Sequence, residues 1–372
     1  MNNSLKKELS FAAALGALTT YKRFPLLSRI LALSSGALFI SSLAKKFDLN
    51  GKSVLITGGS RGLGLSLAWN ILERGGQVML LARDEDELFK GKEMLLNDFP
   101  SASIFTCTCD VTKMPDLTKA FDQAFLEMNG IDLLINNAGS ILVGPFTSME
   151  LEDFEAQIRL HLYAAVQTTQ LIVPHFKSRG GGRILNICSM GGKVAVPHML
   201  PYDASKFALA GFSQGVTAEL AKEDIFVTTA YPALMRTGSA IQAVFKGEHE
   251  KEFAWFETLD NFPGLSLSAD RAAKNILDAV CDGRTEILLS MPAKLRMLLG
   301  AFLPETMNLI MSFSNRFLPE EDSVIRKTGA DSMRLMENTK LLKPMLERAR
   351  EEEKRYNQEP HHDAARNMGL LH

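Results

Sequence analysis

The chain has 372 residues and a nearly balanced charge, with 41 Lys and Arg against 43 Asp and Glu and a formal net charge of −2. Nucleic-acid-binding proteins are typically strongly basic, so this class is excluded. Hydrophobic residues make up 46% and charged residues 23%, which excludes a disordered or collagen-like chain. The four cysteines form no C-x-x-C pair, so the sequence predicts neither a disulfide scaffold nor a zinc site, but reduced thiols in a reducing compartment.

Residues 1–50 differ from the rest because positive charge is combined with two apolar stretches. Stretch 11–18 is short, and stretch 26–43 is 18 residues long but contains Arg29 and five serines. A membrane span needs about 20 mostly apolar residues. We expect this segment to attach to a membrane through its basic and apolar side chains. An arm packed on the folded domain and a cleaved secretory signal are the two alternatives.

Residues 51–290 alternate short apolar runs with segments of helical periodicity. The runs are 53–57, 77–82, 103–109, 131–135, 183–187, 225–231 and 286–289. Short runs that are apolar on both faces and separated by helices are typical of a parallel sheet covered on both sides. The pattern predicts one α/β domain with a doubly wound, mostly parallel seven-stranded sheet of the Rossmann type.

Two segments follow this domain. Residues 291–319 are rich in Met, Leu and Phe and predict an apolar helical extension. Residues 320–372 are polar and highly charged, which predicts a solvated helix and a frayed tail. The tail histidines 361, 362 and 372 have no neighbouring Cys or spaced carboxylates, so no metal site is predicted.

A glycine-rich turn follows the first predicted strand and precedes a predicted helix. It reads Thr57-Gly58-Gly59-Ser60-Arg61-Gly62-Leu63-Gly64. Glycine allows positive φ and a close approach of the backbone to a diphosphate, and the following helix N-terminus offers free N–H groups to an anion. The position of the turn between a strand and a helix indicates a dinucleotide-binding site.

Two arginines bear on the choice of dinucleotide. An acid at the end of the second strand would bond to a ribose 2′-hydroxyl and repel a 2′-phosphate. The sequence has Arg83 there, and Arg61 lies within the glycine turn. Because Arg pairs with phosphate in a bidentate geometry, the sequence predicts NADP(H) rather than NAD(H), although Asp84 beside Arg83 softens the preference.

The candidate catalytic residues are Ser189, Tyr202 and Lys206. Tyr202 and Lys206 are four residues apart on a predicted helix, so they share one face. A neighbouring ammonium stabilises phenolate, and we expect Lys206 to lower the pKa of Tyr202 and make it a general acid/base. Ser189 follows strand 183–187, at the edge where functional groups of such sheets gather, and its hydroxyl is suited to stabilising a substrate oxyanion.

Jointly, these motifs resemble the short-chain dehydrogenase/reductase family over residues 52–289. The resemblance implies that Ser189, Tyr202 and Lys206 are catalytic, that Lys206 also holds the nicotinamide ribose, and that Asp110 contacts the adenine. The residues themselves and the resemblance together predict the cofactor-binding set Gly58, Ser60, Arg61, Gly62, Leu63, Gly64, Arg83, Asp110, Val111, Asn137, Ala138, Gly139, Tyr202, Lys206, Pro232 and Thr237.

Two positions depart from the family pattern. His161 stands where the family has its fourth catalytic residue, an asparagine, which supports a proton-relay water. Imidazole also relays protons near neutral pH, so we expect an altered relay, with a purely packing histidine as the alternative. Pro232-Ala233 replaces the family's Pro-Gly, so the backbone at Ala233 must avoid positive φ.

The substrate is predicted from apolar segments. In this family the segment at 238–267 covers the substrate, and here it contains Phe245, Phe253, Trp255, Phe256 and Phe262. Residues 291–318 would add a wall, dip into a membrane, or serve in packing or a dimer contact. We expect an NADP(H)-dependent enzyme that interconverts a carbonyl and an alcohol on a fatty-acyl, sterol-like or retinoid-like substrate, with Tyr202 donating the proton in reduction.

Other functions remain open. A soluble ketoacyl-carrier or sugar/polyol reductase is the first alternative, and an NADP(H)-binding redox sensor without turnover is the second. The resemblance implies homo-oligomers that pair through the helices at 151–176 and 202–223. The expected location is the cytoplasm, with membrane association through the N-terminal segment.

Overall fold

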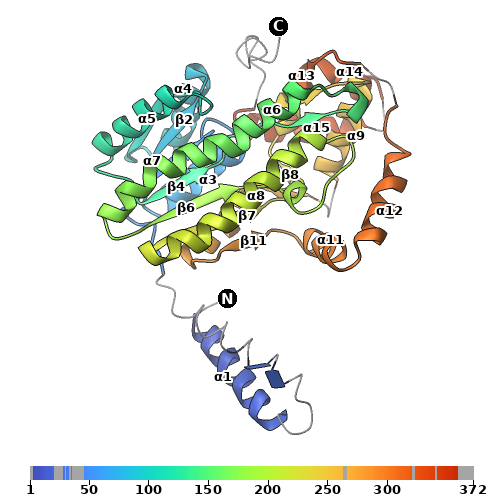
Figure 1. The fold of residues 1–372 in the computed structure, drawn as a ribbon. Helices are drawn as coiled ribbons and strands as arrows, with labels where there is room; N and C mark the ends of the chain where they lie inside the picture. Colours follow the sequence, from blue (N-terminus) through green and yellow to red (C-terminus); the bar gives the residue numbers. More distant parts are fainter. Residues whose placement is uncertain are drawn as a thin grey trace. The chain divides into compact units, whose positions relative to one another are not determined.

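The computed structural model describes residues 3–20, 28–29, 31–32, 35, 46–262, 266–320, 323–339 and 342–358 (Figure 1). The chain forms two compact units, residues 1–47 with 281–283, and residues 48–280 with 284–372. The first unit contains helix α1 (Asn3–Thr20). The apolar stretch predicted at 26–43 lies largely outside the described residues. Within the described part of the chain, no helix combines the length and the apolarity that crossing a membrane requires.

The second unit is built on a seven-stranded sheet in the order β11-β7-β6-β4-β1-β2-β3. All pairings in it are parallel. Its strands are β1 (Ser53–Thr57), β2 (Gln77–Ala82), β3 (Ile104–Thr108), β4 (Leu133–Asn136), β6 (Gly182–Ile187), β7 (Ile225–Tyr231) and β11 (Glu286–Leu288). The predicted doubly wound sheet is confirmed; β1, β2 and β7 have the predicted bounds, and the ends of the other strands differ by at most two residues.

Helices cover both faces of this sheet. They are α3 (Gly62–Glu73), α4 (Glu85–Asp98), α5 (Met114–Glu127), α6 (Leu151–Ile158), α7 (Ala164–Ser178), α8 (Leu200–Leu220) and α10 (Ala269–Cys281). Side chains of α5, α7 and α8 pack with strand residues in one apolar core. Figure 1 shows α7 and α8 crossing in front of the strands and α3 behind them. The all-buried pattern of β1 follows from this double cover.

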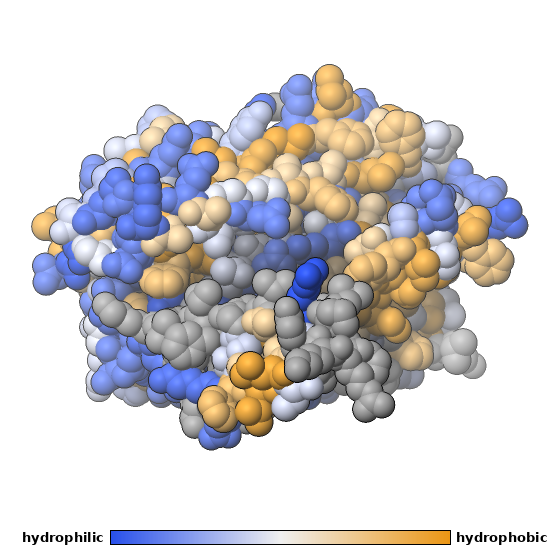
Figure 2. Space-filling model, turned by 60° about the horizontal axis from the view of Figure 1, so that its bottom comes forward, coloured by the Kyte–Doolittle hydropathy of each residue, from blue (hydrophilic) through white to orange (hydrophobic). Residues whose placement is uncertain are grey.

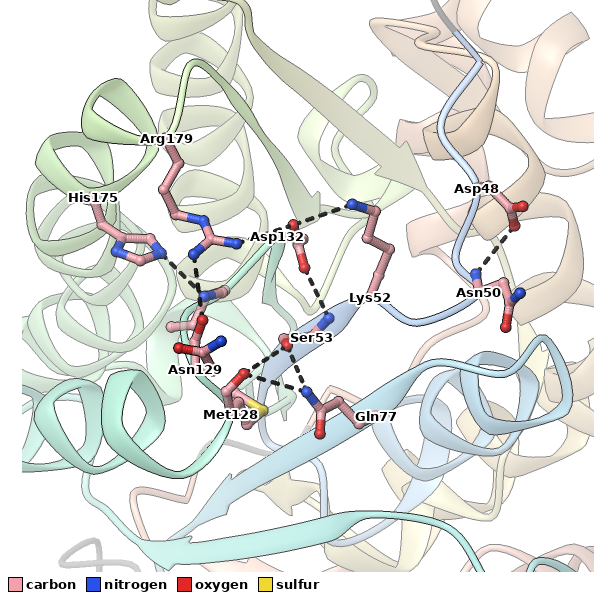
Figure 3. Close-up of polar contacts among 11 residues, drawn as sticks. Asp48, Asn50, Lys52, Ser53, Gln77, Met128, Asn129, Asp132, His175 and Arg179 are labelled. Carbon is pink, nitrogen blue, oxygen red and sulfur yellow. Dashed lines mark hydrogen bonds and ion pairs between the residues drawn. The ribbon is translucent and has the colours of Figure 1, made fainter.

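Polar side chains at the amino edge of the sheet bond to one another (Figure 3). Asp132 accepts hydrogen bonds from the Ser53 backbone N–H (3.0 Å) and from Lys52 Nζ (3.4 Å). Ser53 Oγ donates to Met128 O (3.1 Å) and accepts from Gln77 Nε2 (2.7 Å). These contacts join β1, β2 and the start of β4, so the polar groups of this edge stabilise the sheet. In sheets of this type, ligands bind at the opposite, carboxyl edge.

A smaller layer beside the carboxyl edge combines segments far apart in the sequence. Its strands are β5 (Leu142–Val143), β9 (Val244–Phe245) and β12 (Lys327–Thr328), joined in one sheet, and β8 (Met235–Arg236) with β10 (Leu267–Ser268) in another. Its helices are α9 (His249–Asn261), α13 (Gly329–Ser332), α14 (Arg334–Asn338) and α15 (Lys343–Arg355). Helices α11 (Met291–Phe302) and α12 (Pro304–Asn315) connect this layer to β11.

The C-terminal segment is not a solvated tail as far as residue 358. Met336, Leu346 and Tyr356 are buried, the first two in the apolar cluster that also holds Phe253. The prediction of a solvated helix and tail is therefore wrong for the described part of 320–372. The charged side chains of α15 lie mostly on its exposed face. Because they outnumber its apolar residues, the sequence did not indicate that one face of this helix is buried.

Candidate active site

A cavity of about 500 Å³ opens at the carboxyl ends of the sheet strands. Its walls include the residues that directly follow four strands: Gly58 after β1, Asn137 after β4, Cys188 after β6 and Pro232 after β7. In open parallel sheets, ligands bind in this crevice. The predicted glycine turn and the predicted catalytic residues therefore line one cavity.

The glycine turn is shaped for close approach of a ligand. Gly58 and Gly62 have φ of 63° and 57°, in the left-handed region. A Cβ on Gly58 would lie 2.8 Å from Ala138 Cα, and a Cβ on Gly64 would collide with Gly58 O. Asn137 Nδ2 holds the turn by donating to Gly58 O (2.8 Å). The turn then passes into α3, and Gly62 and Leu63 at the start of this helix line the cavity, where a helix N-terminus suits an anion. These features fit the diphosphate of a dinucleotide.

Arg61 and Arg83 both line the cavity, but their surroundings differ. Arg61 Nη1 donates to Glu87 Oε1 (2.5 Å), and Ser60 Oγ donates to Glu87 Oε2 (3.2 Å). Arg83 is exposed at the rim. Asp84 accepts from the Glu87 N–H and caps α4. The buried Glu87 was not predicted, because no motif links it to the turn that it contacts.

Asp110 follows β3 as predicted but does not line the cavity, whereas its neighbour Val111 does. Asp110 Oδ1 accepts from the N–H and the hydroxyl of Thr112, at 3.0 and 2.7 Å. Partial burial raises the pKa of Asp110, but the two Thr112 hydrogen bonds together with the charges of Arg83 and Lys113 lower the pKa overall. The carboxylate is thus fixed by its own turn.

The three candidate catalytic residues converge on the cavity. Helix α8 carries Tyr202 and Lys206 one turn apart, and Lys206 Nζ lies 5.6 Å from the centre of the Tyr202 ring. Lys206 Nζ donates to Ile187 O (3.0 Å) at the end of β6. Ser189 Oγ accepts from the Gly191 N–H (3.0 Å), which leaves its own proton for another acceptor. The predicted grouping is therefore present in the structure.

The predicted effect of Lys206 on Tyr202 is wrong in this structure. Burial raises the pKa of Tyr202, and a hydrogen bond with Ser189 opposes this shift only in part. Burial also lowers the pKa of Lys206, to about 8. Lys206 is buried and Tyr202 is partly buried, and the ammonium lies 5.6 Å from the centre of the Tyr202 ring. Tyr202 is therefore a neutral phenol here, the form that donates a proton.

His161 is held in its neutral form by its contacts and its burial. Its Nε2 accepts from the Ser140 N–H (3.2 Å), so its proton lies on Nδ1, which contacts Ser205 Oγ (2.7 Å). Complete burial, followed by the charge of Lys206, holds the pKa of His161 well below its usual value. The ring stands edge-on to Tyr202, with centroids 5.5 Å apart. His161 lies in a π-helical turn, Arg159–Tyr163, and lines the cavity.

The predicted residues after β7 lie in the cavity wall. Pro232 and Thr237 line it, and Pro232 O accepts from the Met190 N–H (2.8 Å), next to Ser189. Ala233 lines it too, and it is not among the residues with positive φ, as its Cβ requires. Gly139, Ala138 and Leu63 also lie in the wall, so Gly64 and Asp110 are the predicted cofactor residues that do not.

One part of the cavity wall, here called its apolar end, is formed by apolar side chains. Its wall includes Ile141, Val196, Met199, Phe256 and Ala293. Of the five aromatic residues predicted to cover a substrate, Phe256 alone is in this wall. Phe245 and Phe253 are buried and pack edge-to-face at 5.6 Å in the smaller layer. The sequence alone did not distinguish the aromatic residues that line the cavity from those in the core, because α9 is buried on several of its faces.

Two carboxyl groups that the sequence did not single out also face the cavity. Asp203 Oδ2 accepts from the Val196 N–H (2.6 Å), and Oδ1 has no hydrogen-bond partner within the described residues. Burial raises the pKa of Asp203 to about 8 and that of Asp260 to about 8. The wall near Tyr202 therefore carries protonated carboxyl groups at neutral pH.

Replacement of Asp260 by Asn is expected to flatten the pH dependence of stability. The folded-state pKa of Asp260 is about 8, whereas the ordinary value is 3.8. Between pH 4 and pH 8 the folded protein therefore keeps a proton that the unfolded chain has lost. Its contribution to the free energy of unfolding therefore falls as pH rises from 4 to 8. The melting temperature of Asp260→Asn relative to the wild type should therefore rise by at least about 2 °C from pH 5 to pH 9.

Thermal melts between pH 5 and pH 9 test this, with the exposed Glu93→Gln as the matched control, which should follow the wild type throughout. An equal change in melting temperature at every pH would contradict the buried protonated state of Asp260.

The fold and the site define an α/β oxidoreductase built around a nicotinamide-dinucleotide crevice. The family model described as short chain dehydrogenase matches residues 52–246, more than half of the chain. The chain belongs to the short-chain dehydrogenase/reductase family, and members of this fold bind nicotinamide cofactors.

Relatives and solved structures agree with this assignment. Fatty acyl-CoA reductase of Acinetobacter baylyi is 31% identical over 280 residues, 75% of this chain and 89% of that protein. 3-Dehydrosphinganine reductase of Danio rerio is 31% identical over 193 residues, 50% of this chain and 58% of that protein. A short-chain dehydrogenase structure from Streptomyces avermitilis has a TM-score of 0.61 at 24% identity and covers 71% of this chain and 96% of its own. L-Sorbose reductase of Gluconobacter frateurii, complexed with NADPH and L-sorbose, has a TM-score of 0.58 at 24% identity, with 66% and 98% covered. These two structures share the fold.

Proposed function

We propose that the protein is an NADP(H)-dependent reductase that converts a lipophilic carbonyl compound to an alcohol. One observation carries this proposal: a single cavity joins the glycine turn, the Ser189–Tyr202–Lys206 group and an apolar end. A dinucleotide held at the turn and an apolar substrate held at the other end would meet at Tyr202.

The roles of the residues follow from their contacts. Bound NADPH supplies a hydride. Tyr202, a neutral phenol, donates its proton to the carbonyl oxygen of the substrate. Ser189 donates a hydrogen bond to the same oxygen, because its own acceptor side is already used by the Gly191 N–H. Lys206, anchored by Ile187 O, places positive charge behind the Tyr202 ring as negative charge develops on the phenol oxygen.

The preference for NADP(H) is proposed to come mainly from Arg83. Arg61 is already paired with Glu87, whereas Arg83 is exposed at the rim and Asp84 is used as a helix cap. Arg83→Ala is expected to weaken NADPH binding by about 10- to 100-fold and to leave NADH binding unchanged, since a charge-assisted hydrogen bond to phosphate is lost.

Equilibrium titration of both dinucleotides measures this effect, with Arg83→Lys as the control that keeps the charge and part of the affinity. Equal weakening of NADPH and NADH by Arg83→Ala would contradict a contact with the 2′-phosphate.

The apolar end of the cavity favours a lipophilic substrate, and two relatives are named for fatty acyl-CoA and 3-dehydrosphinganine. The test is NADPH oxidation with long-chain acyl-CoA, long-chain ketones, ketoacyl carriers and sugars side by side. Turnover of the long-chain compounds alone supports the proposal. Turnover of sugars or short ketoacyl carriers alone would favour the soluble reductase instead.

Membrane contact is proposed for the hairpin of α11 and α12. Figure 2 shows apolar atoms over the region where these helices lie. The hairpin exposes nine large apolar side chains: Met291, Leu295, Leu298, Phe302, Leu303, Leu309, Ile310, Phe313 and Phe317. Exposed Lys294 and Arg316 flank them, as is typical of interfacial helices on anionic lipid. Ala293 of α11 lines the cavity, so this contact would place the apolar end of the cavity close to lipid.

Phe302→Asp combined with Phe313→Asp is expected to lower co-flotation with phosphatidylserine-containing vesicles at least about tenfold, because two exposed apolar anchors become anionic. The double variant Phe89→Asp, Leu126→Asp, also exposed but on α4 and α5, is the matched control and should float like the wild type. Equal flotation of both variants would contradict membrane contact through this hairpin.

A further inference from the structure

The chain just beyond α15 turns back onto the glycine turn. We call Tyr356, Asn357 and Gln358 the strap. Asn357 has φ of 55°, and the Gln358 N–H donates to Glu353 O (2.7 Å), which closes α15 with a Schellman-type cap. All three strap residues are at least nine-tenths buried. The cap therefore redirects the chain inward and does not release it to solvent.

The strap is fixed to the backbone of the predicted diphosphate-binding turn. Tyr356 O accepts from the Gly62 N–H (2.9 Å), at the first residue of α3. Asn357 Nδ2 donates to Ser60 O and to Glu87 O, each at 3.0 Å. Three hydrogen bonds thus join residues almost 300 positions apart, and the turn and the strap form one wall.

Gln358 extends this wall into the cavity. Its side chain lines the cavity and is only 4% exposed. Its Nε2 is so close to Gly62 that a Cβ there would lie 2.7 Å away, and Gln242 Nε2 fixes its backbone by donating to Gln358 O (3.0 Å). Across the parts of the chain that the structure describes, Gln358 Oε1 is buried without a hydrogen-bond partner.

A buried acceptor without a partner is costly, and native structures rarely keep one unless a ligand or water completes it. Here the acceptor lies at the start of α3, beside the glycine cradle. The groups that a dinucleotide brings to this place are its ribose hydroxyls and its diphosphate, and of these the hydroxyls are hydrogen-bond donors.

We propose that Gln358 is a further dinucleotide-binding residue, whose carboxamide oxygen accepts a hydrogen bond from a ribose hydroxyl next to the diphosphate. This inference rests on the dinucleotide binding in the proposed function and adds a contact from outside the family match, which ends at residue 246. Asn357 is the positioning residue, because its side chain holds the strap against the turn.

The first test is equilibrium binding of NADPH and of 2′-phospho-ADP-ribose to the full chain carrying Gln358→Ala. Both ligands should bind about tenfold more weakly, because both present the same ribose and diphosphate. The melting temperature without ligand should not fall, since no protein partner of Oε1 is lost. The exposed Glu351→Gln on α15 is the matched control and should bind both ligands like the wild type.

Three outcomes would overturn or redirect the inference. Unchanged binding of both ligands to Gln358→Ala overturns it. Loss confined to NADPH, with 2′-phospho-ADP-ribose unaffected, also overturns it, because the contact would then be to the nicotinamide half. Absence of binding to the wild type contradicts the proposed function itself, and this result is distinguishable because the control variant fails equally.

The second test concerns the strap as a unit. Asn357→Gly keeps the left-handed conformation but removes the hydrogen bonds to Ser60 O and Glu87 O. We expect NADPH to dissociate about tenfold faster in stopped-flow displacement, and Gln358→Ala to add little further in the double variant, because the two act through one contact. Full additivity of the two substitutions in affinity would contradict the positioning role of Asn357.

Discussion

Tyr202→Phe is expected to lower kcat for carbonyl reduction by about 10²- to 10⁴-fold, while NADPH still binds. The change removes one hydroxyl, the group that donates the proton, and leaves the ring to fill the same space beside His161 and Lys206. Tyr202 is a neutral phenol that lines the cavity, so its loss removes the proposed proton donor while the cavity wall keeps its shape.

The measurement is single-turnover NADPH oxidation together with a direct binding titration. Tyr163→Phe is the matched control, since Tyr163 is an exposed tyrosine, and it should react like the wild type. Retained turnover in Tyr202→Phe would contradict the proton-donor role. Loss of turnover and binding together would indicate a disturbed pocket, and a wild type without turnover on any carbonyl would favour the redox-sensor alternative.

Gly64→Ala is expected to weaken dinucleotide binding by more than about 100-fold. A Cβ at this position collides with Gly58 O and lies 2.7 Å from Asn137 Nδ2, the group that holds Gly58 O in place. Because the new Cβ collides with a backbone atom, which cannot rotate away as a side chain can, the whole glycine turn must move. The turn then no longer fits the diphosphate.

Gly211→Ala is the matched control, because Gly211 lies in α8, the helix of Tyr202, with nothing within 4 Å of a new Cβ. This variant should bind normally and gain up to about 1 kcal/mol of stability. Asn137→Ala, which removes the bond to Gly58 O without adding an atom, should lie between the two in affinity. Wild-type affinity in Gly64→Ala would show that the turn does not hold the dinucleotide.

The fold was largely predictable from local sequence. The strands of the central sheet are short and apolar on both faces, as in β1 and β2, and only a doubly covered parallel sheet requires this pattern. The spacing of Tyr202 and Lys206 on a helix and the position of Ser189 after β6 likewise depend on neighbours close in the chain. These features can be predicted without knowledge of the tertiary structure.

What the sequence did not predict depends on contacts between distant segments. Glu87 pairs with Arg61 from another helix, and Gln358 reaches the glycine turn from the far end of the chain. The direction in which the pKa of Tyr202 shifts depends on burial, and the spacing between a tyrosine and a lysine does not reveal burial. The lowered pKa of His161 was not predictable for the same reason, because it comes from burial and from the charge of Lys206.

The apolar residues show a similar limit. Phe245 and Phe256 lie in one aromatic-rich stretch of sequence, yet the first is core and the second lines the cavity. Their hydrophobicity and their place in the segment that covers the substrate in the family predicted both as substrate contacts. The packing of α9 between β9 and the C-terminal helices decides which side each ring faces.

The most direct test of the central claim is transfer of deuterium to a long-chain carbonyl substrate from NADPH that carries deuterium at both C4 positions. Mass spectrometry should find one deuterium on the new alcohol carbon, and Tyr202→Phe, though it binds the dinucleotide, should form almost none of this product. An alcohol without deuterium, or equal product from Tyr202→Phe, would contradict it.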